Sequence, residues 1–282
     1  MSDERASTSW DRWYAIATSF VAPATFVGAL LFYFGYVSAR SEYSYFGIDV
    51  DTLGLSTREY VMRSPQALLV PALLILLLGA ATAALLAGLR SGRLGPQAAA
   101  RFAVAGGLIG AVGLVLVFLY AWLEEWTGYA LLTPLVITTG VGLLALAGRA
   151  RGFPTTVVVL LVLIAVVSTF WATATLAQWT GRGIAKNTAR HLNDLPWVVL
   201  DTKEPLYLRD SVTPQPESLT APGTQEVPQG QTFKYRYEGL RLLIQSGNRM
   251  FLVPQRWDPS DSTIVLDMSD VRVRFRFVNQ PP

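Results

Sequence analysis

The stretch from Thr155 to Trp179, TTVVVLLVLIAVVSTFWATATLAQW, carries no charged side chain. At a rise of about 1.5 Å per residue, a helix of this length crosses the ~30 Å hydrocarbon core of a bilayer. Basic residues precede it at Arg149 and Arg151, and tryptophans lie toward its far end at Trp171 and Trp179. The stretch therefore predicts a membrane-spanning helix.

The composition supports a membrane protein and is uneven along the chain. Hydrophobic residues make up 51% of the 282 residues and charged residues 15%, whereas a soluble globular chain carries roughly 25% charged residues. Long apolar runs fill the larger N-terminal part, and alternating or polar sequence fills the rest. We therefore expect a helical membrane domain followed by a water-facing β domain.

Charged residues divide the N-terminal part into apolar segments that each exceed the ~20 residues needed for a spanning helix. The predicted fold is membrane all-α with five transmembrane helices, plus a small C-terminal all-β antiparallel sandwich or barrel. The expected parts are a tail at 1–12, a membrane domain at 13–180 with spans at about 13–38, 66–89, 102–122, 129–148 and 155–179 and an outer loop at 39–65, a juxtamembrane linker at 181–194, and the β domain at 195–282.

The distribution of arginine predicts the orientation in the membrane. Loops 90–101 and 148–151 are basic, whereas the turn at Glu124 and Glu125 is acidic, and the loop at 39–65 mixes both signs. Short loops with an excess of Arg and Lys remain in the cytoplasm. We therefore expect the N-terminus in the cytoplasm and the C-terminal β domain outside.

The outer loop contains a helix start signal. Ser56 and Glu59 have the spacing of a capping box, which predicts a short helix that begins there, runs toward the second span and lies along the outer interface. Asp49 and Asp51 superficially suggest a cation site, but the loop lacks the glycine and the distal glutamate of a calcium loop. No metal is expected.

Small residues indicate where the helices can touch. The third span contains Gly106-x-x-x-Gly110. In lipid, helices associate through close packing of their backbones, which glycine permits. This spacing favours a helix contact at Gly106 and Gly110.

The C-terminal domain alternates in the manner of strands. Val271, Val273, Phe275 and Phe277 should face one way, and a row of three arginines should face the other. The row could bind an anionic envelope polymer, a lipid headgroup or a protein partner. Alternatively it is a solvated face whose charges pair with acids on neighbouring strands. The arginines are Arg272, Arg274 and Arg276.

The motifs YFGY…YSYFGID…LGLSTREY, from Tyr33, and GLRLLIQSGNRMFLVP, from Gly239 to Pro254, resemble those of a group of uncharacterised multi-span membrane proteins of actinobacterial type. The resemblance covers the first outer loop and the C-terminal domain. It implies a multi-pass protein of the bacterial plasma membrane, and it implies no particular activity, cofactor or site residue.

Templates for catalysis are missing from the sequence. There is no cysteine, and the one histidine, His191, follows a basic segment and is expected to be a solvated surface residue. Common metalloprotease, hydrolase and phosphate-binding motifs do not occur. The net charge of +3 is too small to favour nucleic acid. We therefore expect neither an enzyme nor a cofactor.

The outer half of the fifth span is polar. Continued as a helix, it would carry basic residues at four-residue spacing on one face. At the axis of a homo-oligomer, these residues would line a pore with a basic outer vestibule, and Glu124 and Glu125 would lie at its rim. The alternative is that the hydroxyls hold helices together and the basic residues face water or lipid phosphate. The candidate pore residues are Ser168, Thr169, Thr173, Gln178, Thr180, Arg182, Lys186 and Arg190.

Two functions follow from these patterns. The first is a homo-oligomeric ion channel or pore with an extracytoplasmic β cap. The second is a non-conducting sensor or assembly subunit, whose β domain binds a protein or anionic envelope partner. Both include the lipid bilayer as a partner, and self-association or a membrane or envelope protein partner is expected.

Overall fold

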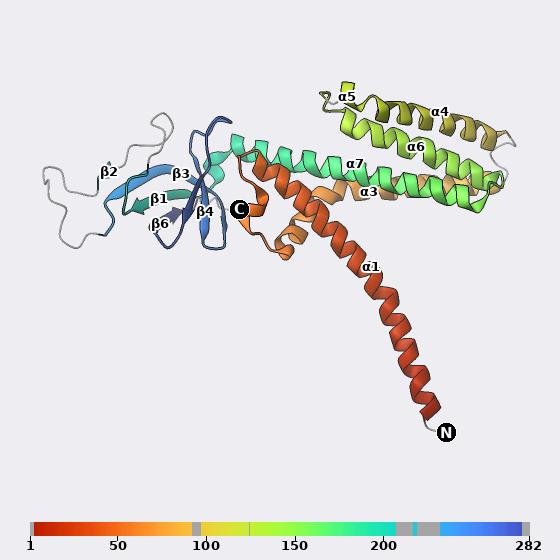
Figure 1. Ribbon diagram of the computed structural model, residues 1–282, viewed down its shortest axis with the longest axis horizontal. Helices are drawn as coiled ribbons and strands as arrows, with labels where there is room; N and C mark the ends of the chain where they lie inside the picture. Colours follow the sequence, from red (N-terminus) through yellow and green to blue (C-terminus); the bar gives the residue numbers. More distant parts are fainter. Residues whose placement is uncertain (1–2, 92–96, 124, 207–216, 219–231, 278–282) are drawn as a thin grey trace. The chain divides into compact units, whose positions relative to one another are not determined.

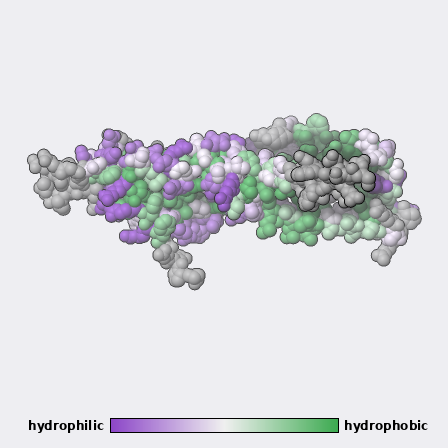
Figure 2. Space-filling model, turned by 90° about the horizontal axis from the view of Figure 1, so that it is seen from below, coloured by the Kyte–Doolittle hydropathy of each residue, from purple (hydrophilic) through white to green (hydrophobic). Residues whose placement is uncertain are grey.

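The computed structural model describes residues 3–91, 97–123, 125–206, 217–218 and 232–277. The chain divides into two compact units, each built from separate stretches of sequence. Unit 1 comprises Met1–Ser38 and Val61–Thr180, and unit 2 comprises Ala39–Tyr60 and Gly181–Pro282. Hydrophobic residues (green) dominate the visible surface of the unit 1 helices, and hydrophilic residues (purple) are frequent on unit 2 (Figure 2).

Unit 1 is helical, and the long helices are α1 (Asp3–Ser44), α3 (Thr57–Arg90), α4 (Ala98–Phe118), α6 (Tyr129–Ala150) and α7 (Thr155–Arg190), with a short α5 (Tyr120–Leu123) (Figure 1). Within the described residues, four helices are long and apolar enough to cross a bilayer, namely α3, α4, α6 and α7. The span predicted at 13–38 lies inside α1, which is not among these four. A membrane-embedded helical domain is thus confirmed with four of the five expected spans.

Helices α4 and α6 lie side by side because glycines remove the side chains that would separate them (Figure 1). A Cβ added at Gly140 of α6 would come within 2.3 Å of the main-chain nitrogen of Gly110, and one at Gly106 within 2.7 Å of that of Leu144. The hydroxyl of Tyr129 also donates to the main-chain carbonyl of Leu116. The helix contact expected at Gly106 and Gly110 is therefore present.

A second contact joins α1, α3 and α7. Phe34 of α1, Ala67 of α3, and Ala174 and Ala177 of α7 form one buried cluster. Phe170 packs on Phe34 with ring centroids 5.2 Å apart. The small alanines let α7 approach its neighbours closely, which is how helices gain packing energy where lipid removes the hydrophobic effect.

The capping box predicted at Ser56 and Glu59 is present at the start of α3, and α3 is longer than the short helix that was expected. The main-chain N–H of Ser56 donates to Glu59 Oε2 at 2.7 Å, and the main-chain N–H of Glu59 donates to Ser56 Oγ at 3.3 Å. The helix that starts there does not stop short of the second span: α3 continues without a break to Arg90. Helix α7 likewise continues through Gly181 and Gly183, so the predicted linker is helical as far as Arg190.

Unit 2 contains the outer loop as a buried element. Tyr43, Phe46, Ile48 and Leu53 are all at most 5% exposed. A one-turn helix, α2 (Val50–Leu53), follows Asp49, whose carboxylate accepts from the N–H of Asp51 at 3.2 Å. The apolar residues of this loop are therefore part of a folded unit.

The β strands of unit 2 form one antiparallel sheet in the order β5-β4-β3-β1-β6, and β2 pairs with β3 at the side. Their bounds are β1 (Trp197–Thr202), β2 (Glu217–Ser218), β3 (Tyr235–Ser246), β4 (Arg249–Pro254), β5 (Ile264–Asp267) and β6 (Val271–Arg276). A short 3-10 turn, Leu192–Asp194, joins α7 to β1. Strands β5 and β6 are consecutive in sequence and lie at opposite ends of the sheet order.

The sheet has a single core. Val198, Leu200, Tyr237, Leu240, Met250 and Leu252 form its buried centre. Ile264 of β5 and Val273 of β6 both pack against this centre. The antiparallel β domain that the sequence predicted is therefore present as one sheet among the described strands.

Candidate functional site

The polar residues of α7 fall into two groups, and the first is buried. Ser168 and Thr173 are about 5% and 6% exposed. The hydroxyl of Thr169 donates to the carbonyl of Ala165 at 2.8 Å, and that of Thr173 to the carbonyl of Thr169 at 2.8 Å. Such bonds to the preceding turn satisfy a hydroxyl inside its own helix.

Two further threonines follow the same rule. Thr180 donates to the carbonyl of Leu176 at 2.9 Å. The hydroxyl of Thr175 lies 3.2 Å from the carbonyls of both Trp171 and Ala130, and Ala130 belongs to α6. Of these four hydroxyls, that of Thr175 reaches a neighbouring helix, and those of Thr169, Thr173 and Thr180 bond within α7.

The second group is exposed. Gln178, Arg182, Lys186 and Arg190 follow one another at four-residue spacing on the continuous helix, and all are exposed. The helix does carry the basic stripe that the sequence predicted. Of the acids expected at the rim, Glu125 is exposed in the turn before α6, and Glu124 lies outside the described residues.

On the sheet of unit 2, the arginines predicted in the row all point away from the core. Val271, Val273 and Phe275 are half-buried against the core, whereas Arg272, Arg274 and Arg276 are exposed. Phe277 lies beyond the strand end and is 64% exposed. The alternation is thus confirmed up to the end of β6.

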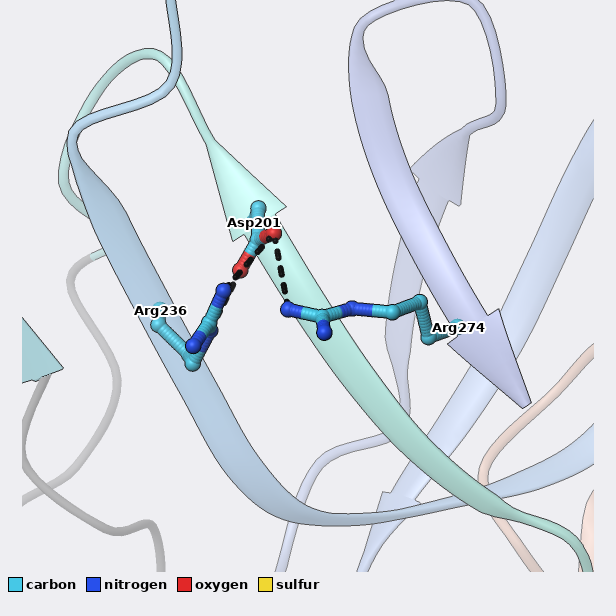
Figure 3. Close-up of polar contacts among 3 residues, drawn as sticks. All are labelled: Asp201, Arg236 and Arg274. Carbon is cyan, nitrogen blue, oxygen red and sulfur yellow. Dashed lines mark hydrogen bonds and ion pairs between the residues drawn. The ribbon is translucent and has the colours of Figure 1, made fainter. Parts of the chain in front are cut away.

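Asp201 of β1 lies between arginines from both neighbouring strands (Figure 3). Its Oδ1 accepts from Arg236 Nε at 2.8 Å, and its Oδ2 accepts from Arg274 Nη2 at 3.3 Å. Asp201 is 4% exposed, and burial by itself raises the pKa of its carboxyl. The hydrogen bonds and charges of Arg236 and Arg274 outweigh burial and hold this pKa below its ordinary value.

The same outward surface holds a further arginine, Arg241 of β3, which is buried. Its Nη1 donates to the carbonyl of Leu195 at 2.9 Å, and its Nη2 to Asn193 Oδ1 at 3.0 Å. The guanidinium lies 5.1 Å from the ring centroid of Trp197. This side chain fastens the turn after α7 to the sheet, with a cation–π contact in addition.

We define the arginine face as Arg236, Arg272, Arg274 and Arg276 around Asp201. Arg236 and Arg274 share the single carboxylate, and the Arg274 side chain remains 58% exposed. Within the part of the chain that the structure describes, Arg272 and Arg276 take part in no ion pair. The face therefore carries more positive charge than its own acid can balance.

The outer loop contacts the unit 2 sheet near β4 and β5, on the face that points away from the core. Thr263 Oγ1 donates to the carbonyl of Phe46 at 2.6 Å, and Arg249 Nη2 donates to the carbonyl of Thr52 at 2.8 Å. The ring of Trp257 lies 5.0 Å from that of Phe46. The contact is consistent with the burial of Phe251 of β4, which is 1% exposed although it lies outside the core cluster.

Sequence reasoning identified the arginine row and missed what surrounds it. Asp201, Arg236 and Arg241 come from strands whose pairing register cannot be derived from alternation alone. One signal was available, since Asp201 is the only acid in an otherwise apolar strand, WVVLDT. An acid in a buried strand predicts a basic partner beside it.

No metal site emerges from the described residues. They contain no cluster of three or more His, Cys, Asp or Glu that could hold a metal ion. His191 is exposed at the end of α7, with Nδ1 3.0 Å from the carbonyl of Asn187.

Comparison with known proteins adds no relative. No family model matches the chain. No curated protein matches, and no solved structure matches. The functional argument therefore depends on the geometry of the chain itself.

Proposed function

We propose that this protein is a non-conducting membrane subunit whose C-terminal unit binds an anionic partner outside the cytoplasm through the arginine face. The observation that carries the proposal is the charge imbalance of this face. Arg236 and Arg274 share the carboxylate of Asp201, and Arg272 and Arg276 take part in no ion pair among the described residues. Arginine is well suited to a carboxylate or phosphate partner because its planar fork donates two parallel hydrogen bonds.

The anchoring of the sheet supports a binding role. The arginine face is on β1, β3 and β6, and the outer loop holds the sheet near β4 and β5 through Thr263 and Arg249. Arg241 fastens the turn after α7 to β3. A site on strands that are held by such contacts loses little conformational entropy when a partner binds.

The topology that we propose has five membrane crossings, with α1 as the first. Arg12 and Arg40 of α1 enclose a stretch without charged residues, long enough to span. Five crossings place the termini on opposite sides. The basic loops around Arg93 and Arg149 favour a cytoplasmic N-terminus. A tag after Pro282 should then react with an impermeant label in intact cells, and protection of that tag would contradict the orientation.

Binding of a polyanion tests the arginine face. Full-length protein in detergent should bind fluorescent poly-glutamate and should not bind neutral dextran of similar length. The double variant Arg272→Gln, Arg276→Gln should lose most of this affinity, because neither arginine takes part in an ion pair within the described residues. Arg256→Gln is the matched control, since Arg256 is an exposed arginine of unit 2 outside the arginine face.

The salt dependence separates specific binding from general attraction. Affinity should fall as ionic strength rises, because exposed charges are screened beyond a Debye length of about 8–10 Å. Equal losses in the double variant and in Arg256→Gln would mean that the polyanion recognises net charge only. That outcome would contradict a defined site.

A channel is the second candidate, and the exposed stripe on α7 favours it. Arg182 and Lys186 lie on one face of an unbroken helix, as a basic vestibule requires. The buried hydroxyls of Thr173 and Thr175 weigh against a pore along the same helix. Purified protein in planar bilayers decides between the two: unitary currents that change in Lys186→Glu support the channel, and silent membranes support the binding subunit.

A further inference from the structure

An apolar cavity of about 680 Å³ lies among α3, α6 and α7. Its lining extends from Ile75 to Leu86 on α3, from Thr138 to Arg149 on α6, and from Val158 to Thr169 on α7. At about 1.5 Å per residue, each range covers about 16 Å of helix. That length is close to half of the ~30 Å hydrocarbon core, so the cavity has the depth of one lipid leaflet.

A second, more polar pocket adjoins one end of this cavity. A neighbouring cavity of about 500 Å³ shares Leu86, Arg149 and Val158 with the first and adds Gly152 and Thr155. Thr155 is the first residue of α7, where main-chain N–H groups lack intrahelical partners and the helix dipole favours an anion. The two cavities together join an aliphatic channel to a pocket that contains an arginine.

The chain offers Arg149 no acid close at hand. Within the described residues Arg149 takes part in no ion pair, and it is exposed. The sequence contains no Asp or Glu from Val61 to Leu123 or from Trp126 to Asn193, which covers α4, α6 and α7 and most of α3. A bound anion at Arg149 would therefore meet no competing acid from these stretches.

We propose that the cavity holds one acyl chain of an anionic phospholipid, whose phosphate lies at Arg149 and the first turn of α7. The aliphatic walls match an acyl chain, and the charge of the polar pocket matches a phosphate. The volume falls within the roughly 300–1,000 Å³ of typical ligand pockets. The site is independent of the arginine face, because every lining residue belongs to unit 1.

Glycines keep the cavity open, and they offer a test. A Cβ at Gly142 of α6 would meet no atom within 4 Å, and Gly142 lines the cavity. Gly142→Leu should therefore fill the space without displacing a neighbour. Gly107→Leu is the matched control, because a Cβ at Gly107 of α4 also meets nothing within 4 Å, and Gly107 is outside the lining.

Native mass spectrometry of the full chain, released from nanodiscs of equal phosphatidylglycerol and phosphatidylcholine, counts the retained lipids. The wild type and Gly107→Leu should each retain one phosphatidylglycerol, and Gly142→Leu should lose it. Equal retention in all three proteins would overturn the proposal. So would a cross-link between two copies through the cavity, which would make a second chain its occupant.

The headgroup is tested with Arg149→Gln against Arg151→Gln, since Arg151 is also exposed and lines neither cavity. The preference for phosphatidylglycerol over phosphatidylcholine should fall about fivefold in Arg149→Gln, and Arg149→Lys should restore most of it. Arg151→Gln should change it little. An equal fall in both glutamine variants would indicate a general basic surface, and that result would contradict the site.

Discussion

In α7, the hydroxyls of Thr169 and Thr173 donate to carbonyls of the preceding turn, whereas on the sheet of unit 2 Arg236 and Arg274 reach across strands to Asp201. The membrane helix satisfies its polar groups locally, and the sheet satisfies them at a distance and incompletely. The hydroxyls of Thr169 and Thr173 therefore have acceptors within the helix, whereas Arg272 and Arg276 take part in no ion pair among the described residues. The difference locates the proposed partner site on unit 2.

The two units also differ in the size of the side chains at their internal contacts. In unit 1, α4 and α6 meet through glycines with no room for a side chain. In unit 2, large side chains such as Tyr237 and Leu240 fill the core of the sheet. Substitutions should therefore act through overpacking in unit 1 and through lost charge pairing in unit 2.

Gly140→Leu should have the largest effect on stability. The new Cβ would lie 2.3 Å from the main-chain nitrogen of Gly110, and backbone cannot yield as a flexible side chain does. We expect a loss of about 3 kcal/mol, the upper part of the range for overpacked cores. Thermal unfolding in detergent measures it, and Gly142→Leu on the same helix should unfold near the wild-type temperature. Equal stability of the two variants would contradict the close contact of α4 and α6.

Asp201→Asn should have the next largest effect. The change leaves Arg236, whose side chain is 27% exposed, without its carboxylate. Breaking a fully buried pair costs about 3–5 kcal/mol, and partial exposure of both arginines reduces this to about 2 kcal/mol. Chemical unfolding of the full chain followed by tryptophan fluorescence measures it. Asp258→Asn, in an exposed turn, is the control, and a similar loss there would show that Asp201 has no special role.

Lowering the pH should protonate the Asp201 carboxylate and so remove its contribution to stability. Because the folded-state pKa of Asp201 is lowered, its contribution to stability is complete above the unfolded pKa of about 3.9 and is lost as pH falls through the folded value. The wild type should therefore lose stability relative to Asp201→Asn as pH falls below about 4. The pKa values of Asp258 and Asp267 are also lowered, chiefly through hydrogen bonds from Ser260 and Ser269. Their effect is common to both proteins, so a stability difference that does not change with pH would contradict the assignment.

Much of the fold was predictable, because hydrophobic periodicity and charge-free length are local properties. The spans within α3, α4, α6 and α7, the capping box at Ser56 and the alternation in β6 all follow from neighbouring residues. What could not be predicted depends on pairs far apart in sequence. The contact of Phe46 with Thr263 joins residues that no local pattern relates, and so does the bond from Arg274 to Asp201.

The burial of the candidate pore residues also could not be predicted from local sequence. Sequence placed Thr173 and Gln178 together on a polar helix end, yet Thr173 is buried and Gln178 is exposed. Periodicity defines a helix face, and only the neighbouring helices decide which face is covered. The neighbours of α7 are α1, α3 and α6, as Phe34, Ala67 and Ala130 show.

Thr173→Val should have the smallest effect and sharpens the contrast between the units. Valine keeps the shape of threonine and removes a hydroxyl whose only described acceptor, the carbonyl of Thr169, already lies within the helix. We expect a change of at most about 0.6 kcal/mol, the average for polar contacts between membrane helices. Thr175→Val is the matched comparison, because its hydroxyl also lies 3.2 Å from the carbonyl of Ala130 in α6. It should cost more than Thr173→Val in the same thermal assay. A large loss in Thr173→Val would mean that its hydroxyl serves something beyond its own helix, as a pore would require.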